Sequence, residues 1–260
     1  MFQELRLLLT AIQFFTRIPV PAWVGHEPQR LSEAVRYFPL TGALVGALCA
    51  IVLMLAEQAL PLPIAVLLSM AAGMLITGAF HEDGLSDFAD GMGGGLTREK
   101  ALLIMKDSSI GAYGAIALML ALMLKYQALL LLYGGHAQLF VPATLIAAHT
   151  FSRVMAASIM ATQDYIRDDE SARAKPAAQN IGAASLAIAL FTGIAAALLP
   201  LFAGASMISI AVAVASAVSM RAYLAWRLKK RLGGYTGDCL GAVQQLTEIS
   251  FYLGLLASIR

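Results

Sequence analysis

The sequence has few charged residues. Lys, Arg, Asp and Glu together make up 13% of its 260 residues, about half of the roughly 25% that is typical of soluble globular proteins. The apolar fraction is 59% and the mean hydropathy is +0.75. These values exclude an ordinary soluble domain and indicate an integral membrane protein. The net charge of +2 is too small to suggest nucleic-acid binding.

Cysteine is scarce as well. Cys49 lies in an apolar run and Cys239 beside a loop, so the pair gives no pattern for a metal site or a disulfide. Ser/Gly linkers, low-complexity tracts and strong internal repeats are also lacking, which predicts a single membrane domain over residues 1–260. The N-terminus carries Glu4 and Arg6 without a small-residue cleavage site, so no signal peptide is expected.

Several apolar runs approach the roughly 20 residues that a membrane-spanning helix requires. A further run, 242–259, contains Gln244, Gln245 and Glu248 in its first half and either crosses the bilayer or only enters it. Residues 1–20 are too short and too polar for a secure span and predict an interfacial or re-entrant helix. The expected fold is an all-α polytopic membrane bundle of six to seven spans. The six stronger runs are residues 37–56, 62–80, 112–132, 139–161, 183–200 and 206–226.

Every second segment that connects these runs contains basic residues. The turns near 57–61, 133–138 and 200–206 contain no Lys or Arg, whereas the opposite connections are all basic. Because Lys and Arg are enriched in cytoplasmic loops, the basic face and its acidic clusters are expected to face the cytoplasm. The basic residues are Arg17, Arg30, Arg36, Arg98, Lys100, Lys106, Arg167, Arg173, Lys175, Arg227, Lys229, Lys230 and Arg231.

Residues 81–91 (HEDGLSDFADG) hold four of the 16 acidic residues. On a helix, Asp83, Asp87 and Asp90 fall at i, i+4 and i+7 and share a face. Carboxylates in this arrangement repel one another, and Mg²⁺ or Mn²⁺ would offset the repulsion. Glu82 is a further candidate ligand. The alternative is a solvated helix end without a metal, but the glycines that follow argue against it.

A second polar segment, residues 104–114, follows the acidic one. Lys106 suits a phosphate group and Asp107 could complete the metal site. Ser108 and the backbone amides around Gly111 could hold phosphate oxygens at a helix start. The alternative is an interfacial loop with a serine cap and a lysine that snorkels to the surface.

Other polar residues lie in or beside the apolar runs. Arg153, four residues after His149, is expected to pair with one of the acids or with a substrate phosphate, or else to snorkel. His149 is expected to be a hydrogen-bonded packing residue. Asp238 follows a glycine-rich turn and is expected to contact substrate or metal, the alternative being a helix N-cap. Lys125 has no assigned role.

These segments resemble the cobalamin synthase family from end to end. The matching stretches are residues 14–19 (FFTRIP), 81–91, 105–114 (MKDSSIGAYG) and 234–241 (GYTGDCLG). One departure is Ser109, where a basic residue is expected in many members.

The resemblance implies a multi-pass, Mg²⁺-dependent enzyme of the bacterial inner membrane. It would transfer adenosylcobinamide phosphate from adenosylcobinamide-GDP to α-ribazole or its 5′-phosphate and release GMP. It would act late in cobalamin assembly, as a homo-oligomer or together with other cobalamin-assembly enzymes.

The resemblance and the residues together suggest a mechanism. Asp83, Asp87 and Asp90, with Glu82 or Asp107, would hold Mg²⁺ on the pyrophosphate. A carboxylate or His81 would take the proton of the attacking ribazole hydroxyl. The expected substrate-binding residues are Lys106, Ser108, Arg153, Asp238 and Arg17.

Two other functions remain open at this point. A CDP-alcohol phosphotransferase also uses spaced aspartates in a membrane, but its Asp-Gly pair is followed by Ala-Arg, whereas here Asp83-Gly84 leads to Leu85-Ser86. A transporter would also contain intramembrane charges and broken helices. Against it, the acids gather toward one face and no pair of broken helices repeats across the halves.

Overall fold

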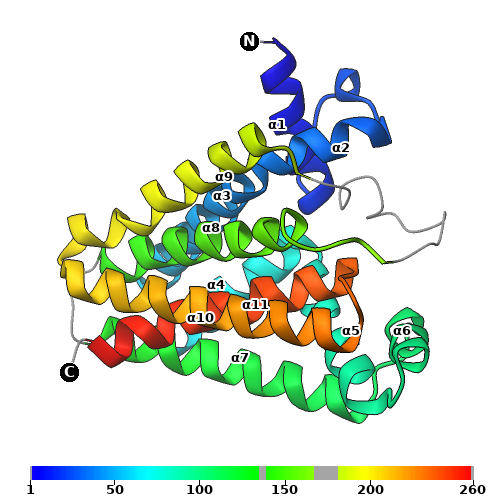
Figure 1. Cartoon of the computed structure of the whole chain (residues 1–260). Helices are drawn as coiled ribbons and strands as arrows, with labels where there is room; N and C mark the ends of the chain where they lie inside the picture. Colours follow the sequence, from blue (N-terminus) through cyan, green and yellow to red (C-terminus); the bar gives the residue numbers. More distant parts are fainter. Residues whose placement is uncertain (1, 135–138, 167–180, 259–260) are drawn as a thin grey trace.

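The computed structural model describes residues 2–134, 139–166 and 181–258, and these form helices joined by short connections. Long helices lie side by side in a bundle, with α1 and α2 standing apart at one end (Figure 1). The helices are α1 (Phe2–Phe15), η1 (Ala22–Val24), α2 (Pro28–Ala34), η2 (Val35–Tyr37), α3 (Phe38–Ala56), α4 (Leu62–Thr77), α5 (Phe80–Gly94), α6 (Arg98–Lys106), α7 (Ala112–Tyr133), α8 (Phe140–Met160), α9 (Ala183–Ala197), η3 (Leu199–Ala203), α10 (Met207–Arg231) and α11 (Gly237–Ser258).

Five helical segments of the described residues are long and apolar enough to cross a membrane. The bent pair of α4 and α5 would make a sixth. The prediction of an all-α, polytopic membrane bundle is therefore confirmed. The five segments are Arg30–Ala56, Ala112–Tyr133, Phe140–Met160, Ala183–Ala203 and Met207–Arg231.

The run predicted as one span over residues 62–80 is broken in the structure. Helix α4 ends at Thr77, and the chain bends by 87° before α5 begins at Phe80. Gly78 (φ 69°) and Ala79 (φ 55°) make the bend in the left-handed region, which glycine enters easily and alanine rarely. As a result, the acidic segment forms a helix of its own at an angle to α4.

The weak seventh run forms the central helix α11. It packs against α5, α7, α8 and α10, and Gln244, Gln245, Thr247 and Glu248 are all buried. Its polar residues therefore face protein and not lipid, which is where polar groups in membrane helices normally lie.

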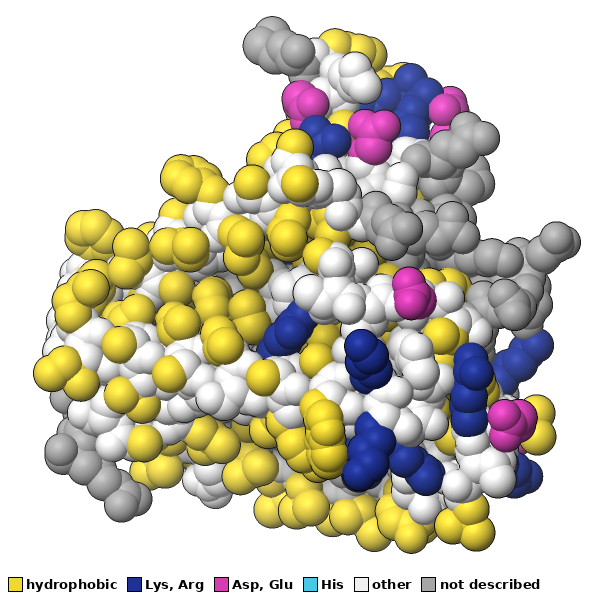
Figure 2. Space-filling view, in the orientation of Figure 1, with side chains coloured by type: hydrophobic (Ala, Val, Ile, Leu, Met, Phe, Trp, Pro, Cys, Tyr) yellow, Lys and Arg dark blue, Asp and Glu magenta, His cyan; other side chains and the backbone are white. Residues whose placement is uncertain are grey.

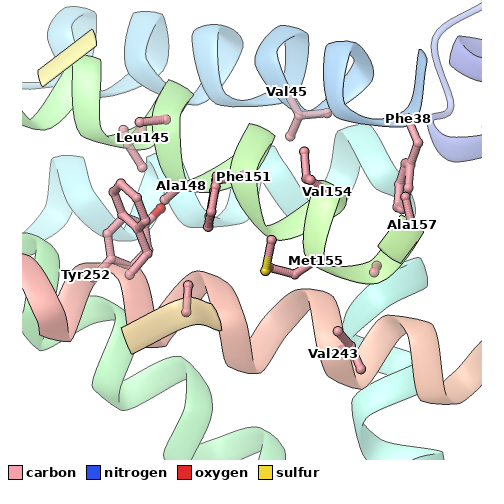
Figure 3. Packing of buried hydrophobic residues seen from close by; sticks show 14 of the residues in the cluster. Phe38, Val45, Leu145, Ala148, Phe151, Val154, Met155, Ala157, Val243 and Tyr252 are labelled. Carbon is pink, nitrogen blue, oxygen red and sulfur yellow. The ribbon is translucent and has the colours of Figure 1, made fainter. Parts of the chain in front are cut away.

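Small residues let the helices of the core approach one another closely. Buried apolar side chains of α3, α8 and α11 pack against one another in the space between these three helices (Figure 3). On α3, Gly42 and Gly46 lie against the backbone of α8, where a Cβ on Gly46 would come 2.8 Å from the Cα of Ile146. This spacing of two glycines is typical of close crossings of membrane helices.

The surface divides into an apolar part and a charged end. In Figure 2, hydrophobic side chains cover most of the bundle, while Lys, Arg, Asp and Glu gather over α1, α2, α6 and the end of α10. Exposed apolar residues on α7 include Ile116, Met119 and Met123, as expected for a helix that faces lipid. Turn residues 135–138 and the segment 167–180, with Arg167, Arg173 and Lys175, lie outside the described residues.

Candidate functional site

The acidic residues of α5 point in different directions. Asp83 is exposed and Asp87 is half-buried, whereas Glu82 and Asp90 are buried. The face predicted for Asp83, Asp87 and Asp90 is exposed at Asp83, half-buried at Asp87 and covered at Asp90 by the start of α7. The four acids therefore differ in their surroundings and in their access to solvent.

Asp90 holds the N-terminus of α7. Its carboxylate accepts hydrogen bonds from the backbone amides of Gly111 (2.8 Å) and Gly114 (2.9 Å). A Cβ on either glycine would overlap this carboxylate, so glycine is required at both positions. The amides of Gly111 and Gly114, expected to hold phosphate oxygens, donate to Asp90 instead. These two hydrogen bonds join the acidic motif, residues 81–91, to the polar motif, residues 105–114.

The loop between α6 and α7 presents the second motif to solvent. Lys106, Asp107 and Ser108 are all exposed. The Asp107 carboxylate accepts a hydrogen bond from the Ser109 amide at 2.9 Å, and this bond and one from the Ser109 side chain hold the pKa of Asp107 below its usual value. Asp107 is therefore an anion at neutral pH, beside the cation Lys106.

The start of α11 crosses α5 at two glycines. A Cβ on Gly84 would lie 3.0 Å from the Asp238 carbonyl oxygen and 3.2 Å from the Cα of Gly241. This contact brings half-exposed Asp238 beside the acidic helix. The hydroxyl of Thr236, and not Asp238, accepts from the Cys239 amide and caps α11. Asp238 is not the side-chain cap that the sequence allowed as an alternative.

Arg17 lies at the bend between α4 and α5. Its amide donates to the Ile76 carbonyl at 2.6 Å, and its side chain lies on Gly78, where a Cβ would come 3.0 Å from its Cζ. The side chain is exposed. The cation therefore lies just before the first turn of α5.

His81 and Glu82 face the interior of the bundle. Glu82 accepts a hydrogen bond from Gln245 of α11 at 3.0 Å. His81 is 2% exposed and stacks against Phe38, with ring centroids 5.9 Å apart. Both residues therefore point away from the exposed carboxylates of α5.

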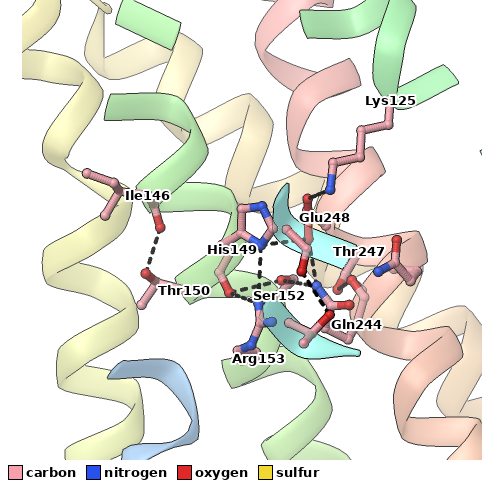
Figure 4. A network of polar contacts seen from close by, with 12 residues as sticks. Lys125, Ile146, His149, Thr150, Ser152, Arg153, Gln244, Thr247 and Glu248 are labelled. Atoms are coloured by element: carbon pink, nitrogen blue, oxygen red, sulfur yellow. Dashed lines mark hydrogen bonds and ion pairs between the residues drawn. The ribbon is translucent and has the colours of Figure 1, made fainter. Parts of the chain in front are cut away.

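A network of polar contacts lies deeper in the bundle (Figure 4). Lys125 Nζ is 2.6 Å from Glu248 Oε1, and Gln244 donates to Glu248 Oε2 at 2.6 Å. Tyr252 donates to the same carboxylate at 3.1 Å, and His149 Nδ1 lies 3.4 Å from it. The expected packing role of His149 is confirmed, and Lys125 has a partner.

Arg153 is a buried residue of the same region. It is 1% exposed, donates to the His149 carbonyl at 2.8 Å and lies over the Phe38 ring at 5.6 Å. The alternative that Arg153 snorkels to the surface is therefore wrong. Its position leaves Lys106 and Arg17 as the exposed cations among the predicted substrate ligands.

The sequence reading missed the pairing of Lys125 with Glu248. The available signal was the presence of opposite charges in two apolar runs, because charges inside a membrane normally pair with each other. The pairing could not be chosen from the sequence, since Glu82, Arg153 and His149 are candidate partners as well.

The exposed predicted residues gather at the charged end of the bundle. The backbone of Asp238 in α11 lies against Gly84, the neighbour of Asp83 in α5, and Asp90 ties the Lys106 loop to the same helix. Within residues 2–134, 139–166 and 181–258, no three His, Cys, Asp or Glu side chains converge tightly enough to hold a metal by themselves. An ion here would need further ligands from water or substrate.

Comparison with known proteins identifies the family of the chain. The sequence model described as cobalamin-5-phosphate synthase matches residues 7–256. The chain belongs to this family. It is 46% identical over 98% of its length to an adenosylcobinamide-GDP ribazoletransferase of Shewanella frigidimarina, covering 95% of that protein. A Leptothrix cholodnii protein of the same name is 46% identical over 100% of the chain and 98% of its own length.

Family membership decides between the functional alternatives. It favours the transferase over a CDP-alcohol phosphotransferase or a transporter. No solved structure matches the chain.

Proposed function

We propose that this protein is an adenosylcobinamide-GDP ribazoletransferase. It joins adenosylcobinamide phosphate to α-ribazole or its 5′-phosphate and releases GMP. The observation that carries the proposal is the meeting of three separate motifs at one end of the bundle, through the Asp90 bonds to Gly111 and Gly114 and the Gly84 contact with α11. The full-length relatives that bear this name support it.

The carboxylates of Asp83 and Asp87 suit Mg²⁺. Asp83 and Asp87 lie one turn apart on α5, and the backbone of Asp238 lies against Gly84 of the same helix. Mg²⁺ is commonly bound by one or two carboxylates together with waters and substrate phosphates, which agrees with a site that lacks a third convergent protein ligand. We assign the metal to Asp83 and Asp87, and we assign Asp238, whose backbone lies against Gly84, to contact with the substrate. When bound, Mg²⁺ would neutralise charge on the pyrophosphate.

The other predicted metal ligands have different positions. Asp90 is occupied by two backbone amides and Glu82 bonds Gln245 in the interior. Asp107 is exposed in the loop and can approach a substrate there. We therefore give Asp90 and Glu82 supporting roles in the site.

The exposed residues can carry out phosphoryl transfer. The ribazole hydroxyl oxygen bonds to the phosphorus attached to cobinamide, and the bond from that phosphorus to the GMP oxygen breaks. Lys106 and Arg17 stabilise negative charge on the phosphoryl oxygens. One of the exposed carboxylates accepts the hydroxyl proton in preference to His81, which faces the interior.

The basic residues at the charged end indicate how the protein is oriented in the membrane. The end of α10 lies against the segment before α6, because Arg231 donates to the Leu96 carbonyl at 3.2 Å. This contact brings Lys229 and Lys230 of α10 to the same end of the bundle as α6, which carries Arg98, Lys100 and Lys106. Figure 2 shows Lys and Arg side chains gathered over this end. Because basic segments stay in the cytoplasm, we place this end and the active site on the cytoplasmic side of the inner membrane.

The test is GMP release by the purified, detergent-solubilised protein. Adenosylcobinamide-GDP and α-ribazole 5′-phosphate are supplied with and without Mg²⁺. Release that needs both the acceptor and the metal is expected. Release without the acceptor would indicate a hydrolase, and an absence of release with any divalent ion would refute the proposal.

A further inference from the structure

A cavity of about 420 Å³ opens beside the start of α5. It lies between α1, the segment that leads into α2, and the first residue of the acidic helix. Its volume falls within the roughly 300–1,000 Å³ of typical small-molecule sites. Residues that line it are Thr10, Gln13, Phe14, His26, Glu27 and Phe80.

The walls of this cavity suit a flat aromatic ring. Phe14 and Phe80 are arranged edge to face, with centroids 6.0 Å apart and planes at 73°. Phe80 is 40% exposed although it is a large apolar residue. Bases stack on aromatic side chains of this kind in many nucleotide sites.

The rim of the cavity is polar. The Gln13 amide nitrogen lies 3.1 Å from His26 Nε2. The Glu27 carboxylate is held by Arg30 at 2.6 Å and by Arg6 at 3.8 Å, and its side chain remains 53% exposed. The rim therefore offers a fixed carboxylate with free acceptor capacity, together with an amide and an imidazole.

We propose that this cavity binds the guanine base of the nucleotide substrate. The inference rests on the proposed function and adds a base-binding subsite to it. Guanine presents two neighbouring donors, N1–H and the N2 amino group, which match the two oxygens of the Glu27 carboxylate. The benzimidazole of α-ribazole has no such donors, and adenine has an amino group beside a ring acceptor.

The position of the cavity fits a nucleoside diphosphate. Phe80 is the first residue of α5, and Asp83 follows three residues later, about 4.5 Å along the helix axis. Arg17 lies on Gly78, directly before Phe80. With its base in the cavity, the nucleotide extends its phosphates past Arg17 toward Asp83 and Asp87.

The first experiment separates the two substrates. Phe80→Leu and Gln13→Leu are expected to raise the KM for adenosylcobinamide-GDP about tenfold, the effect of losing one stacking or hydrogen-bonding contact to the base. The KM for α-ribazole 5′-phosphate should not change. Phe202→Leu is the matched control, because Phe202 is 90% exposed in η3, far from the cavity in the sequence and on another element.

The second experiment tests recognition of the base. The wild-type protein should prefer the guanine substrate to its hypoxanthine analogue, which lacks only the N2 amino group, by about tenfold. Glu27→Ala should remove this preference while the two substrates are still turned over. A preference that persists in Glu27→Ala would overturn the assignment of the carboxylate.

A binding measurement keeps this inference distinct from the proposed function. Equilibrium dialysis of labelled GMP against the detergent-solubilised protein requires no turnover. GMP binding that is lost in Phe80→Leu and kept in Phe202→Leu supports the cavity even if no transfer is found. Transfer by the wild type with unchanged KM values in both cavity variants overturns the cavity and leaves the function standing. A raised KM for α-ribazole 5′-phosphate in either cavity variant also overturns it. So does a Phe80→Leu protein that binds less detergent or lipid than the wild type but binds GMP equally well.

Discussion

Lys125 Nζ and Glu248 Oε1 are 2.6 Å apart, and both side chains are almost completely buried between α7 and α11. Each residue lies near the middle of a long helix in a bundle whose outer surface is apolar. A charge at such a depth is costly unless an opposite charge compensates it. The pair therefore fixes how α11 lies against α7, and α11 in turn supports Glu82 and the acidic helix through Gln245.

Removing one member of this pair should destabilise the protein. In Lys125→Met, the Glu248 carboxylate loses its nearest cation, at a cost of roughly 3–5 kcal/mol. The double variant Lys125→Met/Glu248→Gln should regain part of this loss, because no uncompensated charge remains. Thermal unfolding in detergent measures both. Lys229→Met, at the exposed end of α10, is the control, and a single variant as stable as this control would contradict the prediction.

Asp90→Asn should loosen the start of α7. The amide nitrogen of asparagine cannot accept the bond that one carboxylate oxygen now receives from Gly111 or Gly114. A buried donor left without a partner costs about 1–3 kcal/mol. The unfolding temperature should fall, and activity should fall with it as the Lys106 loop moves. An unchanged unfolding temperature would show that these bonds contribute little.

Asp87→Asn should have the opposite pattern. Asp87 is half-buried and asparagine has nearly the same size and shape, so the substitution should leave folding and membrane insertion intact. Loss of a metal ligand should reduce GMP release about 100-fold or more. Activity and unfolding temperature are measured on the same preparation as for Asp90→Asn. Near-normal activity of Asp87→Asn would show that the metal assignment is wrong.

Gly42→Ala should destabilise the crossing of α3 and α8. The added Cβ would overlap the His149 carbonyl oxygen and come 2.7 Å from Arg153 Cδ. Forcing a methyl group into such a contact costs roughly 1–3 kcal/mol. Gly182→Ala is the matched control, because no atom lies within 4 Å of its Cβ position. Equal unfolding temperatures for the two variants would contradict the close packing seen here.

The spans and the acidic and polar motifs were predictable because they depend on local properties of the chain. Runs of apolar residues, the alternation of basic connections and the spacing of Asp83 and Asp87 can all be read along a single segment. The 87° bend was missed because residues 62–80 carry no charge and only two hydroxyl side chains, Ser69 and Thr77, whereas the bend depends on the backbone angles of Gly78 and Ala79. The central place of α11 was missed because its polar residues lower its hydropathy.

The amino-acid sequence was sufficient to establish a helical membrane protein and the segments that carry its chemistry. It could not separate the roles of Asp87 and Asp90, which lie three residues apart in one motif. Their roles diverge because the amides of Gly111 and Gly114, more than twenty residues away in the chain, lie against Asp90 in the folded protein. The tertiary structure likewise paired Lys125 with Glu248 and turned His81 inward, since burial and contact between distant segments decide what each charged or polar side chain can do.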